Sequence, residues 1–454
     1  MNRITRFFLP AFVSKFVFFP VWDIWDRSKK LREFRQLKRS QWQAKEEIES
    51  FQWSRFRALL DYAYQNSPYY QKLFNDAGIT PADIQSREHL SLIPITKKAD
   101  IRNNVNTFIS KAFDRSQLET AKTGGSTGFS LELYFDKQCE EARNAAAMRS
   151  DQWAGWDMGK LRGDLWGNPI LPTSLKQKIR SSCLDRAIFL DTMKLNSQTM
   201  TDFSTQIRQL GVKVIFGHAH SIFIFAKFVE AESVVVPVMD GIIATSMMLL
   251  DHERVVIERV FACKVTNRYG CEEVGLISSE CDAHQAMHIN VEHVLVEFVT
   301  DDGLPAPEGV PAKILVTDLN NHGMPLIRYQ IEDMGAYSND VCECGRGLPL
   351  MTEISGRVAD FLKTKSGDSV SGISLIERTL TDIPGIEQMQ LIQNSLDQLL
   401  VNRVKGKGFS SETDERLIKE FQVVFGDDMS VVIEDVVEIP QLNNGKYRFS
   451  ICNI

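Results

Sequence analysis

A glycine- and hydroxyl-rich segment is the densest chemical signal in the chain. It reads Thr123, Gly124, Gly125, Ser126, Thr127 and Gly128. The glycines let the backbone approach a phosphate closely, and the hydroxyls offer further hydrogen bonds. No Gly-Lys-Ser/Thr triplet follows, so the segment is not a Walker A loop. On its own, the pattern fits either a phosphate-binding loop or a plain surface turn.

Cysteine and histidine side chains form a second candidate site. Cys342 and Cys344 make a close pair before a glycine, and Cys281 lies upstream, with His284 and His288 near it. Thiolates and imidazoles suit tetrahedral Zn²⁺. A Cys-x-Cys pair is a weaker signal than Cys-x-x-Cys, so ordinary reduced cysteines fit as well. The eight cysteines are sparse and follow no secretory signal, which favours a reducing cytoplasm.

The composition is that of an ordinary globular protein. Hydrophobic residues make up 43% of the 454 positions and charged residues 24%. The net charge of −7 indicates no basic face of the kind that binds nucleic acid, so we expect no nucleic-acid partner. No run of about 18 apolar residues occurs, which predicts no membrane-spanning helix.

Residues 1–26 are rich in Phe, Val and Ile and also carry Arg3, Arg6 and Lys15. They lack the small-residue cleavage site of a signal peptide. Two interpretations remain, packing against the rest of the protein and contact with a membrane surface. The first needs fewer special features, and we prefer it.

Strand and helix patterns alternate along the middle of the chain. Strand patterns occur at 131–135, 213–216, 234–238, 241–245, 294–299 and 312–317. Helical spacing of apolar residues occurs at 40–75, 137–154, 220–231 and 251–262. This alternation predicts an α/β fold.

A second, smaller domain is expected after a short polar link near residues 358–365. The order there is a helix at 372–382, strands at 386–392 and 397–404, a helix at 410–425 and a strand at 430–434. We therefore divide the chain into domains 1–357 and 358–454, the second being a compact α+β module.

Five motifs, in order, resemble those of the adenylate-forming superfamily. They are Thr123–Gly128, Tyr269-Gly270-Cys271-Glu272-Glu273, Thr317-Asp318-Leu319 with Met324–Tyr329 and Asp333, Ser355–Asp360, and Asn444–Arg448. Within that superfamily the chain is most similar to phenylacetate–CoA ligase-like proteins, a branch that includes CapK-like proteins of capsular polysaccharide biosynthesis. The resemblance implies a large N-terminal AMP-binding domain with mixed sheets and a small mobile C-terminal lid domain.

The resemblance also implies roles for single residues. The loop, with Tyr269, Gly270 and Arg328, would bind the nucleotide, while Asp333 would bind its ribose. Glu273 would hold Mg²⁺, which prefers oxygen ligands. Lys446 would be the catalytic lysine, and Arg357 would act at the hinge between the domains. Three departures stand out. They are Phe129-Ser130 after the loop, Glu332 where a glycine before the aspartate is usual, and Ala244–Leu249, which lacks the glutamate that often closes that segment.

The same branch carries Cys…His…Cys-x-Cys-Gly-Arg in the order found here. The resemblance therefore implies a structural Zn²⁺ held by Cys281, His288, Cys342 and Cys344. His288 is preferred to His284 because Met287-His288-Ile289 matches the family context better.

The implied reaction joins a carboxylic acid and ATP to give acyl-AMP and pyrophosphate, followed by transfer to CoA. The alternative is transfer to an amine or hydroxyl, for example on a sugar, and a third class is a nucleotide-binding scaffold without catalysis. The sequence identifies neither the acid nor the acceptor. It also leaves the oligomeric state open, although a dimer is compatible with it.

Overall fold

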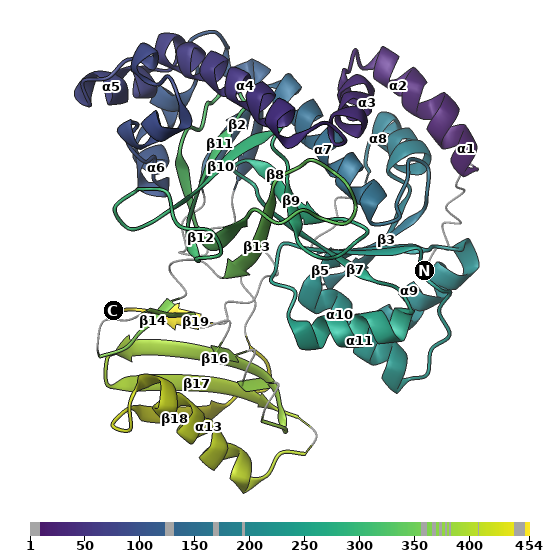
Figure 1. The fold of residues 1–454 in the computed structure, drawn as a ribbon. Coiled ribbons are helices and arrows are strands. Elements are labelled where there is room, and N and C mark those ends of the chain that lie inside the picture. Colours follow the sequence, from purple (N-terminus) through teal and green to yellow (C-terminus); the bar gives the residue numbers. More distant parts are fainter. Residues whose placement is uncertain are drawn as a thin grey trace.

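The structure is a computed structural model with a large α/β part and a smaller α+β part below it (Figure 1). It describes residues 10–122, 131–166, 172–192, 196–355, 361–365, 369–371, 375–376, 379–380, 383–406, 408–439 and 450–454. The expected α/β class is confirmed. The division expected at 357/358 falls outside the described residues.

Helices cover the N-terminal end of the large part. They are α1 (Ala11–Val13), η1 (Ser14–Phe18), α2 (Phe19–Trp25), α3 (Lys30–Ser40), α4 (Lys45–Asn66), α5 (Pro68–Asp76), η2 (Pro81–Asp83), η3 (Arg87–Leu92), α6 (Lys98–Phe108) and η4 (Arg115–Gln117). The helical pattern at 40–75 is divided at Ser67 because Pro68 suits a first helical turn but not a helix interior.

An eleven-stranded sheet runs through the large part in the order β10-β11-β12-β13-β9-β8-β7-β6-β5-β3-β4. The parallel half contains β3 (Arg162–Trp166), β4 (Ala187–Asp191), β5 (Val214–His218), β6 (Gly241–Thr245) and β7 (Val265–Cys271). Its connections contain α8 (Leu175–Arg180), η5 (Ser181–Asp185), α9 (Ser197–Leu210), α10 (Ala219–Ala231) and α11 (Asp251–Phe261). Strand–helix alternation produces parallel neighbours because each strand returns through a helical crossover.

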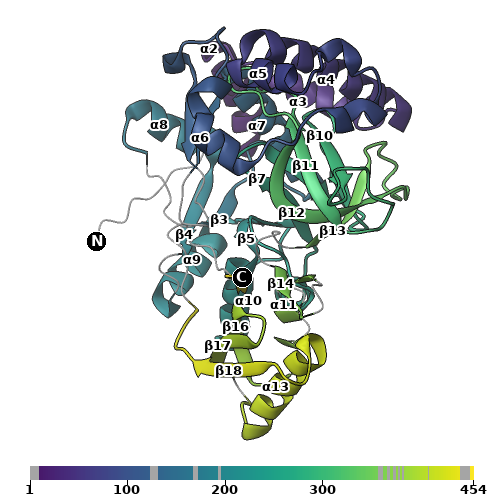
Figure 2. The same ribbon diagram turned by 90° about the vertical axis from the view of Figure 1, so that its left-hand side faces the viewer.

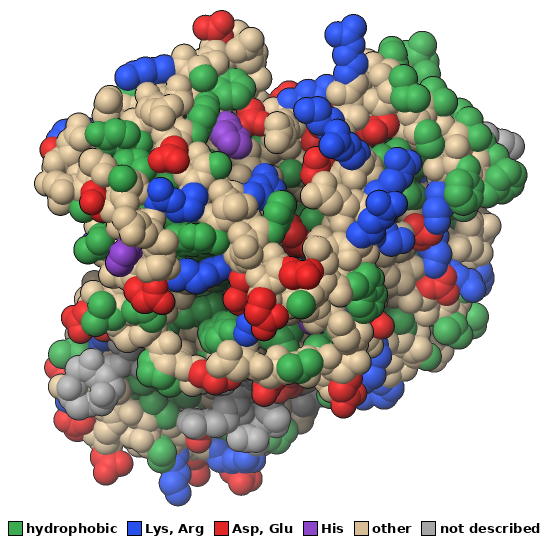
Figure 3. Space-filling model, turned by 45° about the horizontal axis from the view of Figure 1, so that its top comes forward, with side chains coloured by type: hydrophobic (Ala, Val, Ile, Leu, Met, Phe, Trp, Pro, Cys, Tyr) green, Lys and Arg blue, Asp and Glu red, His purple; other side chains and the backbone are tan. Residues whose placement is uncertain are grey.

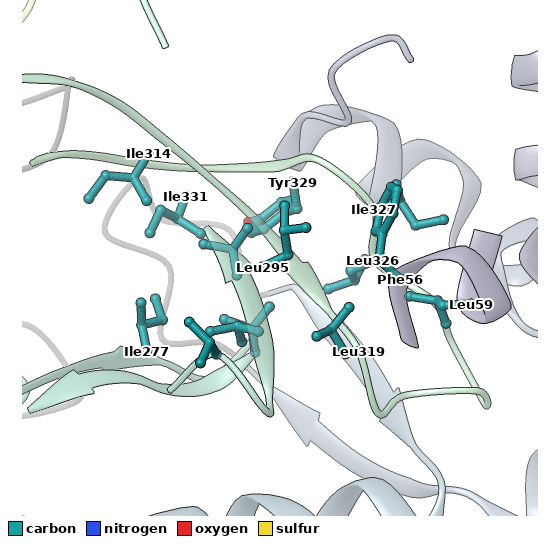
Figure 4. Close-up of a cluster of buried hydrophobic side chains, with 14 of the residues drawn as sticks. Phe56, Leu59, Ile277, Leu295, Ile314, Leu319, Leu326, Ile327, Tyr329 and Ile331 are labelled. Carbon is teal, nitrogen blue, oxygen red and sulfur yellow. The ribbon is translucent and has the colours of Figure 1, made fainter. Parts of the chain in front are cut away.

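The other half of the sheet is antiparallel. It contains β8 (Gly275–Glu280), β9 (Met287–Ile289), β10 (Val294–Val299), β11 (Ala312–Asp318), β12 (Tyr329–Ser338) and β13 (Leu350–Ser355). Its core packs under α4, where Phe56 and Leu59 lie beside Leu326 and Ile327 (Figure 4). This packing fixes the strand ends that carry the candidate site.

The strand expected at 234–238 is wrong. This stretch forms no strand and connects α10 to β6, with Val235 and Val238 exposed. Its β-branched residues suggested a strand, but both edges of β6 are already paired, with β5 and β7. Pro237 also lacks the N–H that a ladder needs.

A hairpin of β1 (Glu119–Lys122) and β2 (Glu132–Phe135) leads into α7 (Lys137–Trp153). The expected strand at 131–135 and the expected helix at 137–154 are confirmed. The glycine-rich segment connects the two hairpin strands and lies outside the described residues.

The smaller part has its own sheet and core (Figure 2). A short pair, β14 (Phe361–Lys363) and β15 (Ser369–Ser371), precedes a sheet of order β18-β17-β16-β19. These strands are β16 (Ile386–Ser395), β17 (Gln398–Lys405), β18 (Ser430–Asp435) and β19 (Ser450–Cys452), with α13 (Ser411–Phe425) packed against them. The expected strands and the helix at 410–425 are confirmed, whereas most of 372–382 lies outside the described residues.

Among the helices that the structure describes, none combines the length and the apolar character needed to cross a membrane.

Candidate active site and metal centre

Glu273 lies in the tight turn that joins β7 to β8 and is 9% exposed. The hairpin leaves no space for a side chain at Gly270, because a Cβ there would lie 2.4 Å from the carbonyl oxygen of Gly275. Gly275 itself has φ +77°, a conformation that favours glycine. The Glu273 carboxylate accepts a hydrogen bond from the hydroxyl of Tyr329 at 3.1 Å. The turn therefore holds this carboxylate in one place.

Arg143 of α7 supports the backbone of this turn. Its guanidinium donates to the carbonyl oxygen of Glu273 at 2.6 Å and to that of Glu272 at 3.2 Å. It also pairs with the buried carboxylate of Asp318 at 2.8 Å. Burial by itself would raise the pKa of Asp318, but Arg143 and His293 hold that pKa below its usual value. Asp318 is thus the anion that balances the buried guanidinium.

His293 completes the support. Its Nε2 donates to the carbonyl oxygen of Val274 at 3.1 Å, and its Nδ1 lies 2.7 Å from the amide nitrogen of Asn320, which donates to it. Burial lowers the pKa of His293 to about 4, so the ring is neutral at physiological pH. All three residues of the 272–274 turn therefore have their carbonyl groups held by Arg143 or His293.

Asp333 on β12 is tied to β7, because the hydroxyl of Tyr269 donates to its Oδ2 at 2.8 Å. In the opposite direction, Tyr329 of β12 donates to Glu273. β13, β9 and β8 separate β12 from β7 in the sheet order, so the sheet must curl to bring the two strands together. The fold thus brings Tyr269, Glu273 and Asp333 together as two crossed tyrosine–carboxylate pairs.

The hairpin that flanks the glycine-rich segment is anchored beside this turn. Asp136, just after β2, accepts from the backbone of His322 at 2.7 Å and of Gly323 at 3.0 Å. The Phe135 ring lies 3.9 Å under the Arg143 guanidinium, the group that holds the Glu273 turn. The strand leaving the segment therefore has a defined position next to Glu273.

Other expected site residues are not placed there. Thr123–Gly128, Arg357 and Lys446 lie outside the described residues. Arg328 is buried, and its guanidinium pairs with Glu297 of β10 at 3.0 Å and donates to the carbonyl of Ile93. This arrangement suits a structural role in holding β12 better than contact with a nucleotide.

The four expected metal ligands are brought together. Cys281 follows β8, His288 lies on β9, and Cys342 and Cys344 lie between β12 and β13, with all four ligand atoms within 4.8 Å of one another. The Cys281 and Cys342 sulfurs are 3.6 Å apart, and the Cys344 sulfur is 3.3 Å from His288 Nε2. Tetrahedral Zn²⁺ with its usual bond lengths places ligand atoms roughly 3.5–3.8 Å apart, so the set fits this ion.

Neighbouring groups suit these residues to metal binding. The amides of Ala283 and Arg346 donate to the sulfurs of Cys281 and Cys344, both at 3.4 Å. His288 Nδ1 lies 3.2 Å from the Leu348 carbonyl, which leaves Nε2 toward the cysteines. Burial lowers the pKa of His288 to about 4, which keeps the imidazole neutral. His284 instead contacts Glu280 at 3.3 Å.

Sequence reasoning missed Arg143 and His293. Arg143 lies 130 positions before Glu273, inside a helix with no motif around it, and His293 follows a short strand. Neither residue type nor spacing marks them, because their role depends on carbonyl groups that only the folded turn presents.

The chain is similar in sequence to two groups of known proteins. Residues 362–453 match the family described as the CapK C-terminal domain. Over 411 residues the chain is 24% identical to protein CapK of Staphylococcus aureus, covering 88% of each chain. Over 328 residues it is 26% identical to phenylacetate-coenzyme A ligase of Thermus thermophilus, covering 70% of this chain and 72% of the relative.

The fold has a counterpart among solved structures. A crystal structure of 2-hydroxyisobutyryl-CoA ligase, in the postadenylation state with 2-HIB-AMP, superposes with a TM-score of 0.73 at 17% identity and covers 91% of each chain. The fold is therefore that of a known class, the adenylate-forming CoA ligases. Within it, the predicted resemblance to the phenylacetate–CoA ligase-like and CapK-like branch is confirmed.

Proposed function

We propose that the protein is an ATP-dependent ligase that activates a carboxylic acid as its acyl-AMP and then transfers the acyl group to CoA. A carboxylate oxygen of the acid bonds to the α-phosphorus of ATP, and the bond between that phosphorus and the oxygen bridging to the β-phosphate breaks to release pyrophosphate. In the transfer step the CoA thiol bonds to the acyl carbon, and AMP leaves. The observation that carries this proposal is the pair of crossed tyrosine–carboxylate contacts, Tyr329 to Glu273 and Tyr269 to Asp333. They hold two acidic groups in fixed positions, and Arg143 links the Glu273 turn to the hairpin of the glycine-rich segment.

Glu273 and Asp333 have different tasks in this proposal. Attack of a carboxylate on a triphosphate brings anions together, so the site must neutralise charge. Glu273, held nearly buried at a rigid turn, would hold Mg²⁺, which supplies that neutralisation at the phosphates. Asp333 would accept hydrogen bonds from the ribose hydroxyls, with Tyr269 orienting its carboxylate.

The remaining roles rest on the motifs. Thr123–Gly128 would hold the departing pyrophosphate through its amides and hydroxyls. Lys446 would bridge the acid and the α-phosphate, and Arg357 would act at the hinge between domains 1–357 and 358–454. Rotation of the C-terminal domain would then present Lys446 in the first half-reaction only.

Exchange of pyrophosphate into ATP over a panel of aryl, fatty and amino acids tests the first half-reaction. We expect one acid class to support exchange and Glu273→Gln to reduce it by about a hundredfold or more, as losses of charge-stabilising groups do. Glu272→Gln is the matched control, because Glu272 is the adjacent exposed carboxylate and should retain activity. Equal exchange by both variants would remove Glu273 from the mechanism.

One observation favours an acceptor of the acyl group other than CoA. Residues 362–453 match the CapK C-terminal domain, and the alignment to protein CapK covers 88% of the chain. The acyl group would then pass to an amine or hydroxyl, for example on a sugar in polysaccharide biosynthesis. Enzyme loaded with the accepted acid should be offered CoA, amines and amino sugars separately, and the acyl product identified by mass spectrometry.

We also propose a structural Zn²⁺ bound by Cys281, His288, Cys342 and Cys344. The distances among the sulfurs and Nε2, together with the amide donors to two of the thiolates, support it. Four protein ligands leave no open position, as is usual at structural sites. All eight cysteines are free, which agrees with residence in a reducing cytoplasm. Elemental analysis of purified protein should find about one zinc per chain.

A further inference from the structure

The helical segment 11–25, formed by α1, η1 and α2, is apolar on all sides. Lys15 and Asp23 are its only charged residues. Its inner face packs on the protein, where Phe19 and Trp22 are buried and Ser14 donates to the backbone of Cys183 on η5. A helix that is apolar all round normally has both faces covered. Here the other described residues cover only one face of the segment.

The outer face of this segment exposes large apolar side chains. Phe16 is 69% exposed, Ile24 is 78% exposed and Trp25 is 62% exposed. α8 extends the same surface, since its Lys176 ammonium lies 5.1 Å from the Trp25 ring and Leu175 is 74% exposed. The N-terminal face is defined by Phe12, Phe16, Val17, Val21, Ile24, Trp25, Leu175 and Ile179. A contiguous patch of this kind indicates an interaction site rather than scattered surface residues.

Basic side chains frame the N-terminal face. Residues 10–40 contain eight Lys and Arg but three Asp and Glu, whereas the whole chain contains 52 and 59. Arg27, Lys29 and Lys178 are exposed beside the apolar residues, as is Arg180, which also pairs with Asp185 at 3.5 Å. Figure 3 shows hydrophobic and basic side chains gathered next to each other over the region of α1–α3. An acidic protein thus presents a locally basic, apolar surface.

We propose that the N-terminal face docks on the surface of an anionic lipid bilayer. Aromatic and aliphatic side chains on one side of a helix, with Lys and Arg at its edges, are the features of helices that lie in the membrane interface. The basic frame complements anionic headgroups, while the acidic remainder of the chain orients this face toward the lipid. The phenyl and indole rings enter the boundary between headgroups and acyl chains.

This docking leaves the candidate active site accessible. The N-terminal face lies at the opposite end of the molecule from the smaller part with β16–β18 and α13, as both ribbon views show (Figures 1 and 2). The face contains none of the residues assigned to nucleotide, acid or metal. The enzyme would act at the bilayer surface with its C-terminal part directed away from the lipid.

Flotation of the full-length protein with vesicles tests the proposal. We expect binding to vesicles of phosphatidylcholine with phosphatidylglycerol, and much weaker binding to phosphatidylcholine alone. The variant Phe12→Gln/Phe16→Gln/Ile24→Gln should bind the anionic vesicles at least about a hundredfold more weakly. Gln sustains helices, so these exposed positions tolerate it. The variant Val255→Gln/Val423→Gln changes exposed valines on α11 and α13 and should bind like the wild type.

The charge contribution is tested separately. Arg27→Gln/Lys29→Gln/Lys178→Gln should lower affinity for anionic vesicles about a hundredfold, and added salt should weaken the wild type similarly. If the wild-type protein fails to float with the anionic vesicles, the proposal is wrong. A wild-type dimer that the triple apolar variant makes monomeric would assign this face to a second copy, which also overturns it. The apolar variant and the charge variant should both retain wild-type pyrophosphate exchange. A loss of vesicle binding can then be distinguished from a failure of the proposed enzymatic function.

Discussion

At the scale of single residues, the site depends on groups that hold other groups. Tyr329 of β12 donates to Glu273, and Tyr269 of β7 donates to Asp333 on β12. Arg143 and His293 hold the turn that contains Glu273. A carboxylate held in this way needs little reorganisation when charge develops in the reaction. Substitution of either carboxylate, or of a residue that holds it in place, is therefore expected to lower the reaction rate.

Lys446→Ala is expected to abolish pyrophosphate exchange, because this lysine would neutralise charge at the acid and the α-phosphate. Thioester formation from supplied acyl-AMP should be largely retained, since the lysine serves the first half-reaction only. Both rates are measured on the same preparation, with Lys419→Ala on the exposed side of α13 as the control. Unchanged exchange in Lys446→Ala would exclude the assignment.

His293 makes stability depend on pH. Burial lowers its folded pKa from 6.5 to about 4, so the unfolded chain takes up a proton first as pH falls. The contribution is fully present above about pH 6.5 and is lost as pH falls toward 4. Between pH 7.5 and 5.5, this residue should lower the free energy of unfolding by about 1.4 kcal/mol.

Urea unfolding at the two pH values measures this effect. His293→Gln should lose this share of the pH dependence, whereas His89→Gln at the surface helix η3 should keep it. Parallel behaviour of the two variants would show that His293 is not the group responsible.

At the scale of elements, the loop between β12 and β13 is held by contacts with residues of other segments. Cys342 and Cys344 face Cys281 and His288 from the β8–β9 region. The amide of Gly347 also donates to the carbonyl of Gln41, just after α3. A bound metal would thus join the 281–288 stretch to the 342–344 loop, two segments that lie more than fifty residues apart in the chain.

Cys342→Ser is expected to lower the zinc content and the stability of the large part. An ion present at a hundredfold excess over its Kd adds about 2.7 kcal/mol, which the variant should lose. Thermal unfolding and elemental analysis measure the two effects, and a strong chelator should reproduce them in the wild type. Cys263→Ser, outside the cluster, is the control. Wild-type stability in Cys342→Ser would contradict a structural zinc.

At the scale of the whole molecule, two parts have separate cores. The smaller part is centred on residues such as Leu391, Leu417 and Phe421, none of which packs in the large part's clusters. All seven tryptophans lie between Trp22 and Trp166, so their fluorescence reports on the large part alone. Separate cores allow one part to move or unfold without the other.

Phe421→Ala should destabilise the smaller part by about 3–5 kcal/mol, because it leaves a cavity in that core. Unfolding followed by circular dichroism should then begin earlier, while the tryptophan transition stays in place. Val423→Ala, at an exposed position of the same helix, should leave both transitions unchanged. A shift of the tryptophan transition with Phe421→Ala would mean that the two parts unfold together.

Much of the fold was predictable from local pattern. The helix at α7, the strands β5, β10 and β11, and the α+β order after residue 383 follow from apolar periodicity. The false strand at 234–238 shows the limit, because β-branched residues suggest a strand wherever they occur. A strand forms only where the folded sheet offers a neighbouring strand with which it can form hydrogen bonds.

The sequence alone determined the class of chemistry and the residue types that carry it, because motif order and ligand type are properties of the chain. Through the resemblance of Met287-His288-Ile289 to the family context, it also favoured His288 over His284 as the metal candidate. The tertiary structure alone decided that the sheet curls enough for Tyr269 and Tyr329 to cross between β7 and β12. It likewise decided that Arg143 supports Glu273, that Arg328 belongs to Glu297, and that one side of α1–α2 stays open. These outcomes depend on contacts between distant segments, which local spacing does not encode.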